Sequence, residues 1–151
     1  MPARNLVIAG LAMSAALILA GCGGGSEPEL PSPAEVQHVA GSPVPQVKLT
    51  ALAMRRIGIA TQPLEMAQDS VDGQSADHKV IPYAAVVYDT DGSTWTYVNT
   101  APQVFLREPV TVAAIDGEAA ILTEGPDVGA AVVTVGAAEL LGTEYNISGE
   151  E

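Results

Sequence analysis

The chain contains one cysteine, Cys22, and its thiol has the most distinctive chemical setting in the sequence. A single cysteine excludes an internal disulfide and a zinc site built on cysteine ligands. The thiol follows Leu19-Ala20-Gly21, and a signal peptidase requires small residues of this kind at its cleavage point. We therefore expect Cys22 to mark a processing site.

An uncharged apolar segment precedes this cysteine. Arg4 supplies a positive start and residues 6–19 follow without a charge, which is the arrangement of a signal peptide. The segment that ends at Cys22 resembles a bacterial lipobox. The resemblance implies that residues 1–21 are a lipoprotein signal peptide and that Cys22 is acylated on sulfur, for instance with palmitate. The acyl chains would anchor the protein in the cell envelope, on the extracytoplasmic face of a membrane. Alternatively, Cys22 is an ordinary residue near the end of a membrane anchor or a secretory signal.

Acidic residues dominate the charged side chains, with 18 Asp and Glu against 6 Lys and Arg, and the formal net charge is −12. A protein that binds nucleic acid non-specifically needs a basic face for the phosphates, so we expect no nucleic-acid partner. The same charge opposes adsorption to anionic lipid. The lipid on Cys22 is therefore the expected membrane contact.

Residues 22–46 are rich in Gly, Pro and Ser and contain few large apolar side chains. Such a composition buries too little surface to offset the entropy of ordering the backbone, so we predict a disordered tether over 22–46. His38 lies inside this segment with no Cys, His or spaced carboxylates around it. We interpret His38 as a solvated linker residue and not as a metal ligand.

From Val47 onward, short apolar segments alternate with glycine turns, and we predict a β-rich domain over 47–141. Asp-Gly pairs at 91–92 and 116–117 each stand between two strand-like segments and predict hairpins. The other expected elements are a strand at 47–50, a short helix at 51–56, a polar loop at 68–78, a strand at 80–88, a buried strand at 130–135, a helical turn at 137–141 capped by Gly142, and a flexible acidic tail at 142–151. The predicted fold class is all-β, a small barrel or sandwich of short antiparallel strands with one or two short helices.

Two local patterns could support chemistry in this domain. His78 next to Asp77 could be a general base with an orienting carboxylate, but no nucleophile lies nearby and adjacent loop residues seldom face one another. Asp89 and Asp91 before Gly92 match the first half of a calcium loop, but the later ligands are missing, which favours a simple turn. We therefore predict no enzyme activity, no cofactor and no metal site.

Four residues on the predicted strands could form a partner-binding surface, namely Trp95, Tyr97, Phe105 and Arg107. Aromatic residues and arginine are enriched at protein interfaces. The aromatic side chains could equally fill the core of a domain that has few large residues. Both interpretations stay open at this point.

Five segments of the domain carry a family resemblance, namely Val47–Thr61, Ile81–Asp89, Gly92–Val98, Arg107–Val112 and Gly129–Leu140. The last four resemble the C-terminal half of periplasmic adaptor subunits, the membrane fusion proteins of resistance–nodulation–division efflux systems, and Val47–Thr61 is similar to the entry strand of the same family. The resemblance implies a β-barrel and a membrane-proximal part that lie near an inner-membrane pump. None of these motifs is catalytic.

Adaptors of this family hold a lipoyl-like domain and a long helical hairpin at a place where this chain has only Gln68–His78. The resemblance thus implies a protein that keeps the pump-proximal part alone. We expect a non-catalytic, membrane-anchored lipoprotein that docks on a membrane transporter of this or another class and supports export, and homo-oligomer formation stays open. The alternative is a cell-envelope lipoprotein that binds a substrate or peptidoglycan.

Overall fold

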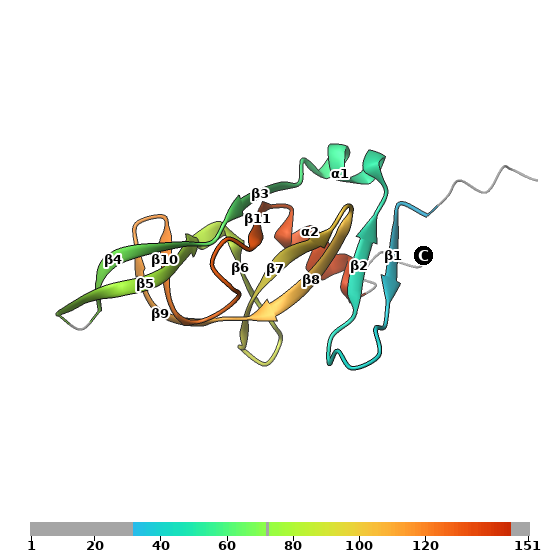
Figure 1. Ribbon diagram of the computed structural model, residues 1–151. Coiled ribbons are helices and arrows are strands. Elements are labelled where there is room, and N and C mark those ends of the chain that lie inside the picture. Colours follow the sequence, from blue (N-terminus) through green and yellow to red (C-terminus); the bar gives the residue numbers. More distant parts are fainter. Residues whose placement is uncertain (1–31, 72, 146–151) are drawn as a thin grey trace, which may run out of the picture. The chain divides into compact units, whose positions relative to one another are not determined.

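The computed structural model describes residues 32–71 and 73–145 (Figure 1). The predicted signal peptide, Cys22, the first part of the predicted tether and the end of the predicted tail lie outside the described residues. In chain order the elements are β1 (Ala34–Gln37), β2 (Gln46–Leu49), α1 (Ala51–Ile57), β3 (Ala60–Pro63), β4 (Glu65–Val71), β5 (Gln74–Pro82), the 3-10 turn η1 (Tyr83–Ala85), β6 (Val86–Tyr88), β7 (Thr94–Ala101), β8 (Val104–Pro109), β9 (Thr111–Asp116), β10 (Ala119–Glu124), β11 (Ala131–Val135) and α2 (Ala137–Glu144).

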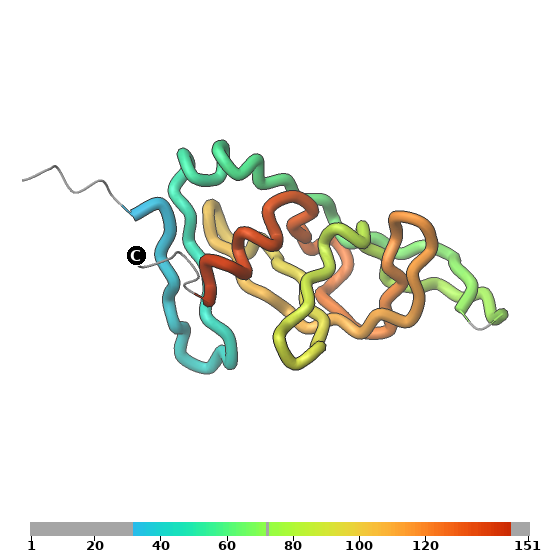
Figure 2. Tube along the Cα trace, turned by 180° about the vertical axis from the view of Figure 1, so that it is seen from behind, coloured from blue at the N-terminus to red at the C-terminus, as the bar shows by residue number. Residues whose placement is uncertain are grey.

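The strands form two sheets in which every pair is antiparallel. The first sheet has the strand order β1-β2-β8-β7-β11-β3, with β6 also paired to β7. The second sheet has the order β4-β5-β10-β9. Helix α2 contacts β2, β6 and β7 of the first sheet (Figure 2). These short antiparallel strands and two short helices confirm the predicted all-β fold class.

Helix α1 is defined by residues at both of its ends. The Thr50 hydroxyl accepts a hydrogen bond from the Ala53 amide at 3.1 Å, which satisfies one of the free N–H groups of the first turn. Gly58 ends the helix with φ at 77°, a left-handed conformation that glycine adopts without steric cost. The predicted short helix at 51–56 is therefore confirmed and extends one residue further.

Both predicted Asp-Gly hairpins are present. In the first, β6 pairs with β7 from Val86↔Thr96 to Tyr88↔Thr94, and Gly92 has φ at 86°. In the second, Asp116 faces Ala119 across the turn between β9 and β10, and Gly117 has φ at 58°. A positive φ at the turn is the conformation for which the Asp-Gly signal selects.

The central strands of the first sheet are packed on both faces. Neighbouring residues on one strand alternate between the two faces, and accordingly Val87 and Val133 lie in one core cluster while Val86 and Val132 lie in another. The first cluster contains Val47, Leu49, Ala53, Val87, Tyr97, Phe105, Val133, Ala137 and Leu140, and the second contains Leu64, Ile81, Ala85, Val86, Val98, Val110, Ala120, Leu122 and Val132. A strand covered on both faces is apolar along its length, which explains the predicted buried strand at 130–135.

The predicted tether is wrong at its C-terminal end. Residues 34–37 form β1, which pairs with β2 from Ala34↔Leu49 to Gln37↔Gln46. Most side chains of β1 are exposed, so its order depends on backbone hydrogen bonds to β2 and on Ala34, which packs against the first core cluster. A composition rule that counts large apolar side chains misses a strand held in this way.

The predicted polar loop at 68–78 is also wrong, because β4 and β5 pair through most of it as a hairpin. The predicted strand at 80–88 is interrupted by η1, so that β5 belongs to the second sheet and β6 to the first. Helix α2 continues through Gly142 to Glu144 and is not capped at Gly142, which places the first part of the predicted tail in a helix.

Candidate functional site

A charged cluster surrounds Arg107 on β8, one of the residues predicted to bind a partner. The residue is only 8% exposed. Its Nη1 donates a hydrogen bond to Asp89 Oδ2 at 2.6 Å, and its Nε lies 2.9 Å from Glu144 Oε1. The second contact is an ion pair whose N–H is not aligned for a hydrogen bond. Arg107 therefore joins the turn after β6 to the end of α2.

Two tyrosine hydroxyls complete the hydrogen bonding of these carboxylates. Tyr97 donates to Glu144 Oε2 at 2.6 Å, and Tyr145 donates to Asp89 Oδ1 at 2.7 Å. We call Tyr97, Arg107, Asp89, Glu144 and Tyr145 the arginine cluster. Each carboxylate receives contacts from both the guanidinium and a hydroxyl, so the single positive charge is shared between two carboxylates that the tyrosine hydroxyls also stabilise.

The contacts of the arginine cluster shift the protonation equilibria of its members. Hydrogen bonds from Tyr145 and Arg107 hold the pKa of Asp89 well below its usual range. Burial and then the hydrogen bond to Glu144 raise the pKa of Tyr97. Burial alone would lower the pKa of Arg107, but the contacts with Asp89 and Glu144 outweigh it and raise the pKa. At neutral pH Asp89 is therefore ionised and Arg107 positively charged, while the Tyr97 hydroxyl keeps its proton.

Aromatic rings also contact the guanidinium. The Arg107 Cζ lies 4.6 Å from the centroid of the Trp95 ring and 5.5 Å from that of Tyr145. A cation over an aromatic face at such distances is attracted by the ring quadrupole. The Trp95 Nε1 donates to Ser93 Oγ at 2.7 Å, so the indole is fixed at both its ring face and its nitrogen.

The predicted partner-binding residues do not form an exposed patch. Tyr97 and Phe105 are 0% exposed and lie in the first core cluster, as the core interpretation predicts. Trp95 is half-buried and packs against the same cluster, and Arg107 is occupied by its two carboxylates. The interpretation of these four residues as a free docking surface is therefore wrong.

The residues of the two local patterns lie in a turn and on a strand. The Asp89 carboxylate is bound by Arg107 and Tyr145, and Asp91 Oδ1 accepts a hydrogen bond from the Ser93 amide, which fits a turn. Asp77 and His78 are neighbours on β5, where adjacent side chains point to opposite faces. Among the residues that the structure describes, no three His, Cys, Asp or Glu residues are grouped to hold a metal ion.

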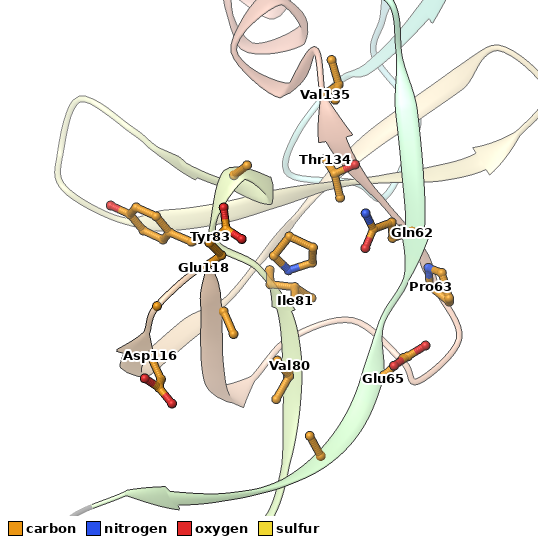
Figure 3. A pocket seen from close by; sticks show the side chains of 15 residues that line it. Gln62, Pro63, Glu65, Val80, Ile81, Tyr83, Asp116, Glu118, Thr134 and Val135 are labelled. Atoms are coloured by element: carbon orange, nitrogen blue, oxygen red, sulfur yellow. The ribbon is translucent and has the colours of Figure 1, made fainter.

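An open cleft of about 880 Å³ lies between the two sheets (Figure 3). Its walls come from segments far apart in the sequence, namely β3 and β4 on one side, β5 and η1 on the other, the turn between β9 and β10, and the end of β11. The residues that line it are Gln62, Pro63, Glu65, Ala67, Val80, Ile81, Pro82, Tyr83, Ala84, Asp116, Gly117, Glu118, Ala119, Thr134 and Val135. The sequence did not predict this cleft, because its lining residues are spread over segments that share no motif. The Asp-Gly-Glu turn at 116–118 predicted only a hairpin.

The polar groups of the cleft stand around an apolar floor. In Figure 3 the Glu118 carboxylate and the Gln62 amide lie on opposite sides, with Ile81 between them. The Tyr83 ring extends beyond Glu118, away from Ile81, and its hydroxyl lies 3.2 Å from that of Tyr88. The cleft thus combines carboxylates, an amide and apolar surface.

A second exposed feature is the free end of the β4–β5 hairpin. The strands pair from Glu65↔Val80 to Val71↔Gln74, whereas β10 pairs with β5 only from Lys79 to Pro82. The tip is therefore a two-stranded ribbon that extends past β10 (Figure 1). We call residues 67–71 and 73–78 the ribbon; most of its side chains are exposed.

Neither helix in the described ranges is long and apolar enough to cross a membrane. Comparison with known proteins found no family model, no curated protein and no solved structure that matches this chain.

Proposed function

We propose that this protein is a non-catalytic, lipid-anchored adaptor module that docks on a membrane transporter and supports export. The observation that carries the proposal is the ribbon. Its strand β4 has a free edge, and its polar and charged side chains are exposed on a hairpin that β10 does not cover. An edge strand with unpaired N–H and C=O groups is a ready site for pairing with another chain.

The position of the ribbon in the sequence supports the same role. It lies where adaptors of the resembled family carry the elements that reach away from the pump. The ribbon continues the paired strands β4 and β5 of the second sheet, so its free edge is held in the extended conformation that pairing with a partner strand requires. The arginine cluster cannot supply this surface, because its charged groups already satisfy one another.

The N-terminal lipid would bring the ribbon to the membrane. Cys22 lies outside the described residues, and its acylation is the lipobox-based expectation. A test is incorporation of labelled palmitate into the full chain, with Cys22→Ala as the control. Labelling that persists in the Cys22→Ala variant would contradict the proposed anchor.

The docking role is tested by photo-crosslinking in the native cell envelope. A photoreactive phenylalanine is placed in the full chain at Gln68 or Gln74 on the ribbon, and at Glu35 or Glu139 as exposed controls on β1 and α2. We expect the ribbon positions, and not the controls, to crosslink to an integral membrane transporter. Equal crosslinking from all four positions, or ribbon adducts with soluble proteins only, would overturn the proposal.

A second candidate function is favoured by the cleft. Its volume of about 880 Å³ falls within the range of about 300–1,000 Å³ that is usual for ligand sites. A cell-envelope lipoprotein that binds a substrate or a peptidoglycan fragment would use such a cleft. Thermal-shift measurements with envelope components test this candidate, and an unchanged unfolding temperature with all of them would exclude it.

A further inference from the structure

The cleft between the two sheets has an apolar floor that no part of the described chain covers. Val80 and Pro82 are partly exposed there and Val135 is 49% exposed, while Ile81 beneath them is buried in the second core cluster (Figure 3). An apolar floor of this kind accepts the hydrophobic body of a ligand, because its burial removes apolar surface from water.

The charges of the cleft all have one sign. Glu65, Asp116 and Glu118 line it, and no Lys, Arg or His among the described residues does. Both ion pairs within residues 32–71 and 73–145 involve Arg107, so none of the three carboxylates is paired with a cation there. Lys79 on the neighbouring strand position does not compensate them, because its ammonium donates to the Gly125 and Pro126 carbonyls, each at 2.7 Å.

We propose that this cleft binds an organic cation with an apolar body. Glu65 on β4 and Glu118 in the turn between β9 and β10 attract the charge from different walls of the cleft. The apolar floor receives the remainder of the ligand. An anion of the same shape is rejected, because it would place like charges side by side.

This inference assigns a ligand class to the second candidate function and rests on the cleft being a ligand site. It does not depend on docking through the ribbon, which uses other residues. A bare metal ion is a poor occupant, since no group of three His, Cys, Asp or Glu is available in the part of the chain that the structure describes.

The experiment uses two probes of the same shape and opposite charge, tetraphenylphosphonium and tetraphenylborate. The full chain is purified in an uncharged detergent, and binding is measured by titration calorimetry with the heat of detergent alone subtracted. At about 0.15 M salt, charges farther away than about 8 Å are largely screened. We expect saturable binding of the cation and none of the anion.

Two charge-matched variants locate the site. In the first, Glu65→Gln, Asp116→Asn and Glu118→Gln remove the three carboxylates of the cleft. In the second, Glu35→Gln, Asp77→Asn and Asp127→Asn remove three exposed carboxylates elsewhere, so the net charge changes equally. We expect the cleft variant to weaken binding of the cation about five- to tenfold, and the matched control to change it by less than about twofold.

Each outcome decides the matter. Equal loss in both triple variants would show that the cation responds to overall charge, and equal binding of both probes would show that shape alone is recognised; either overturns the inference. Far-ultraviolet circular dichroism confirms the fold of each variant. If neither probe binds while a peptidoglycan fragment raises the unfolding temperature, the second candidate function stands and the cation class is wrong.

Discussion

Replacement of Arg107 by methionine should destabilise the domain, because the guanidinium is the partner of a buried carboxylate. The Glu144 side chain is 2% exposed, and its Oε1 lies 2.9 Å from Arg107 Nε. Removal of one partner from a buried ion pair costs about 3–5 kcal/mol, since the other charge is left without compensation. Tyr97 would still donate to Glu144, so we expect the lower end, about 3 kcal/mol.

The loss can be measured by equilibrium unfolding in urea. Trp95 is the only tryptophan, and its ring lies 4.6 Å from the guanidinium, so its fluorescence reports on the arginine cluster directly. With an m-value of about 1.5 kcal/mol per molar urea, a loss of about 3 kcal/mol lowers the midpoint by about 2 M. Far-ultraviolet circular dichroism should give the same midpoint if unfolding is two-state.

Two variants control for the simple loss of a positive charge. Lys48 is an exposed cation on β2, next to β8, and Lys48→Met should change the free energy of unfolding by less than about 0.5 kcal/mol. Arg107→Lys keeps the charge but not the planar fork that reaches both carboxylates, so its loss should be intermediate. If Arg107→Met were no more destabilising than Lys48→Met, the cluster would not stabilise the fold and our reasoning would be refuted.

Three further predictions concern the same domain. Hydrogen bonds to Asp89 hold its pKa below the ordinary value of 3.8, so the stability that this carboxylate contributes above about pH 4 is lost as the pH falls. Asp89→Asn should therefore flatten the decline of the urea midpoint between pH 5 and pH 2. The pKa of Tyr97 is raised above 10.0, so the stability that its hydroxyl contributes is present below pH 10 and is lost as the pH rises further. Tyr97→Phe should cost about 1.5 kcal/mol at pH 7 and should flatten the decline of the urea midpoint above pH 10. An unchanged decline would argue against a role for ionisation of Tyr97. Gly142 lies in helix α2 with open space around it, so Gly142→Ala should stabilise by about 0.5–1 kcal/mol. Gly136→Ala should instead destabilise by about 1–3 kcal/mol, because Gly136 has φ at 90° and a Cβ there would lie 2.8 Å from Ile57 Cγ2. Thermal unfolding of the two glycine variants would show the opposite signs, and destabilisation by both would indicate that Gly142 ends the helix after all.

The sequence predicted the parts of the fold that depend on local chemistry. The Asp-Gly turns at 91–92 and 116–117 produced hairpins, because a turn with positive φ selects its residues independently of the rest of the chain. The α1 helix was predictable for a similar reason, since Thr50 and Gly58 define its two ends.

The errors fall where order comes from pairing with distant residues. Strand β1 is ordered by pairing with β2, and the ribbon is ordered by the pairing of β4 with β5. In both cases the side chains remain largely exposed. The pattern of hydrophobic residues indicates which side chains are buried, but it does not indicate which strands pair through their backbones. The cleft was unpredictable for a related reason, because its walls meet only after the two sheets have formed.

The arginine cluster also constrains where a partner can bind. The residue types of a protein interface occur at Trp95, Tyr97, Phe105 and Arg107, yet these side chains contribute to the core and to one internal ion network. A substitution at any of them is therefore expected to lower the free energy of unfolding, whether or not it affects binding. The ribbon and the cleft carboxylates are exposed and take no part in either core cluster. Substitutions there should alter binding while the free energy of unfolding stays within about 0.5 kcal/mol of that of the unmodified protein. We therefore predict that binding at the two proposed sites and stability of the fold are separable. A variant such as Glu118→Gln that lost both would show that the cleft is part of the structural core.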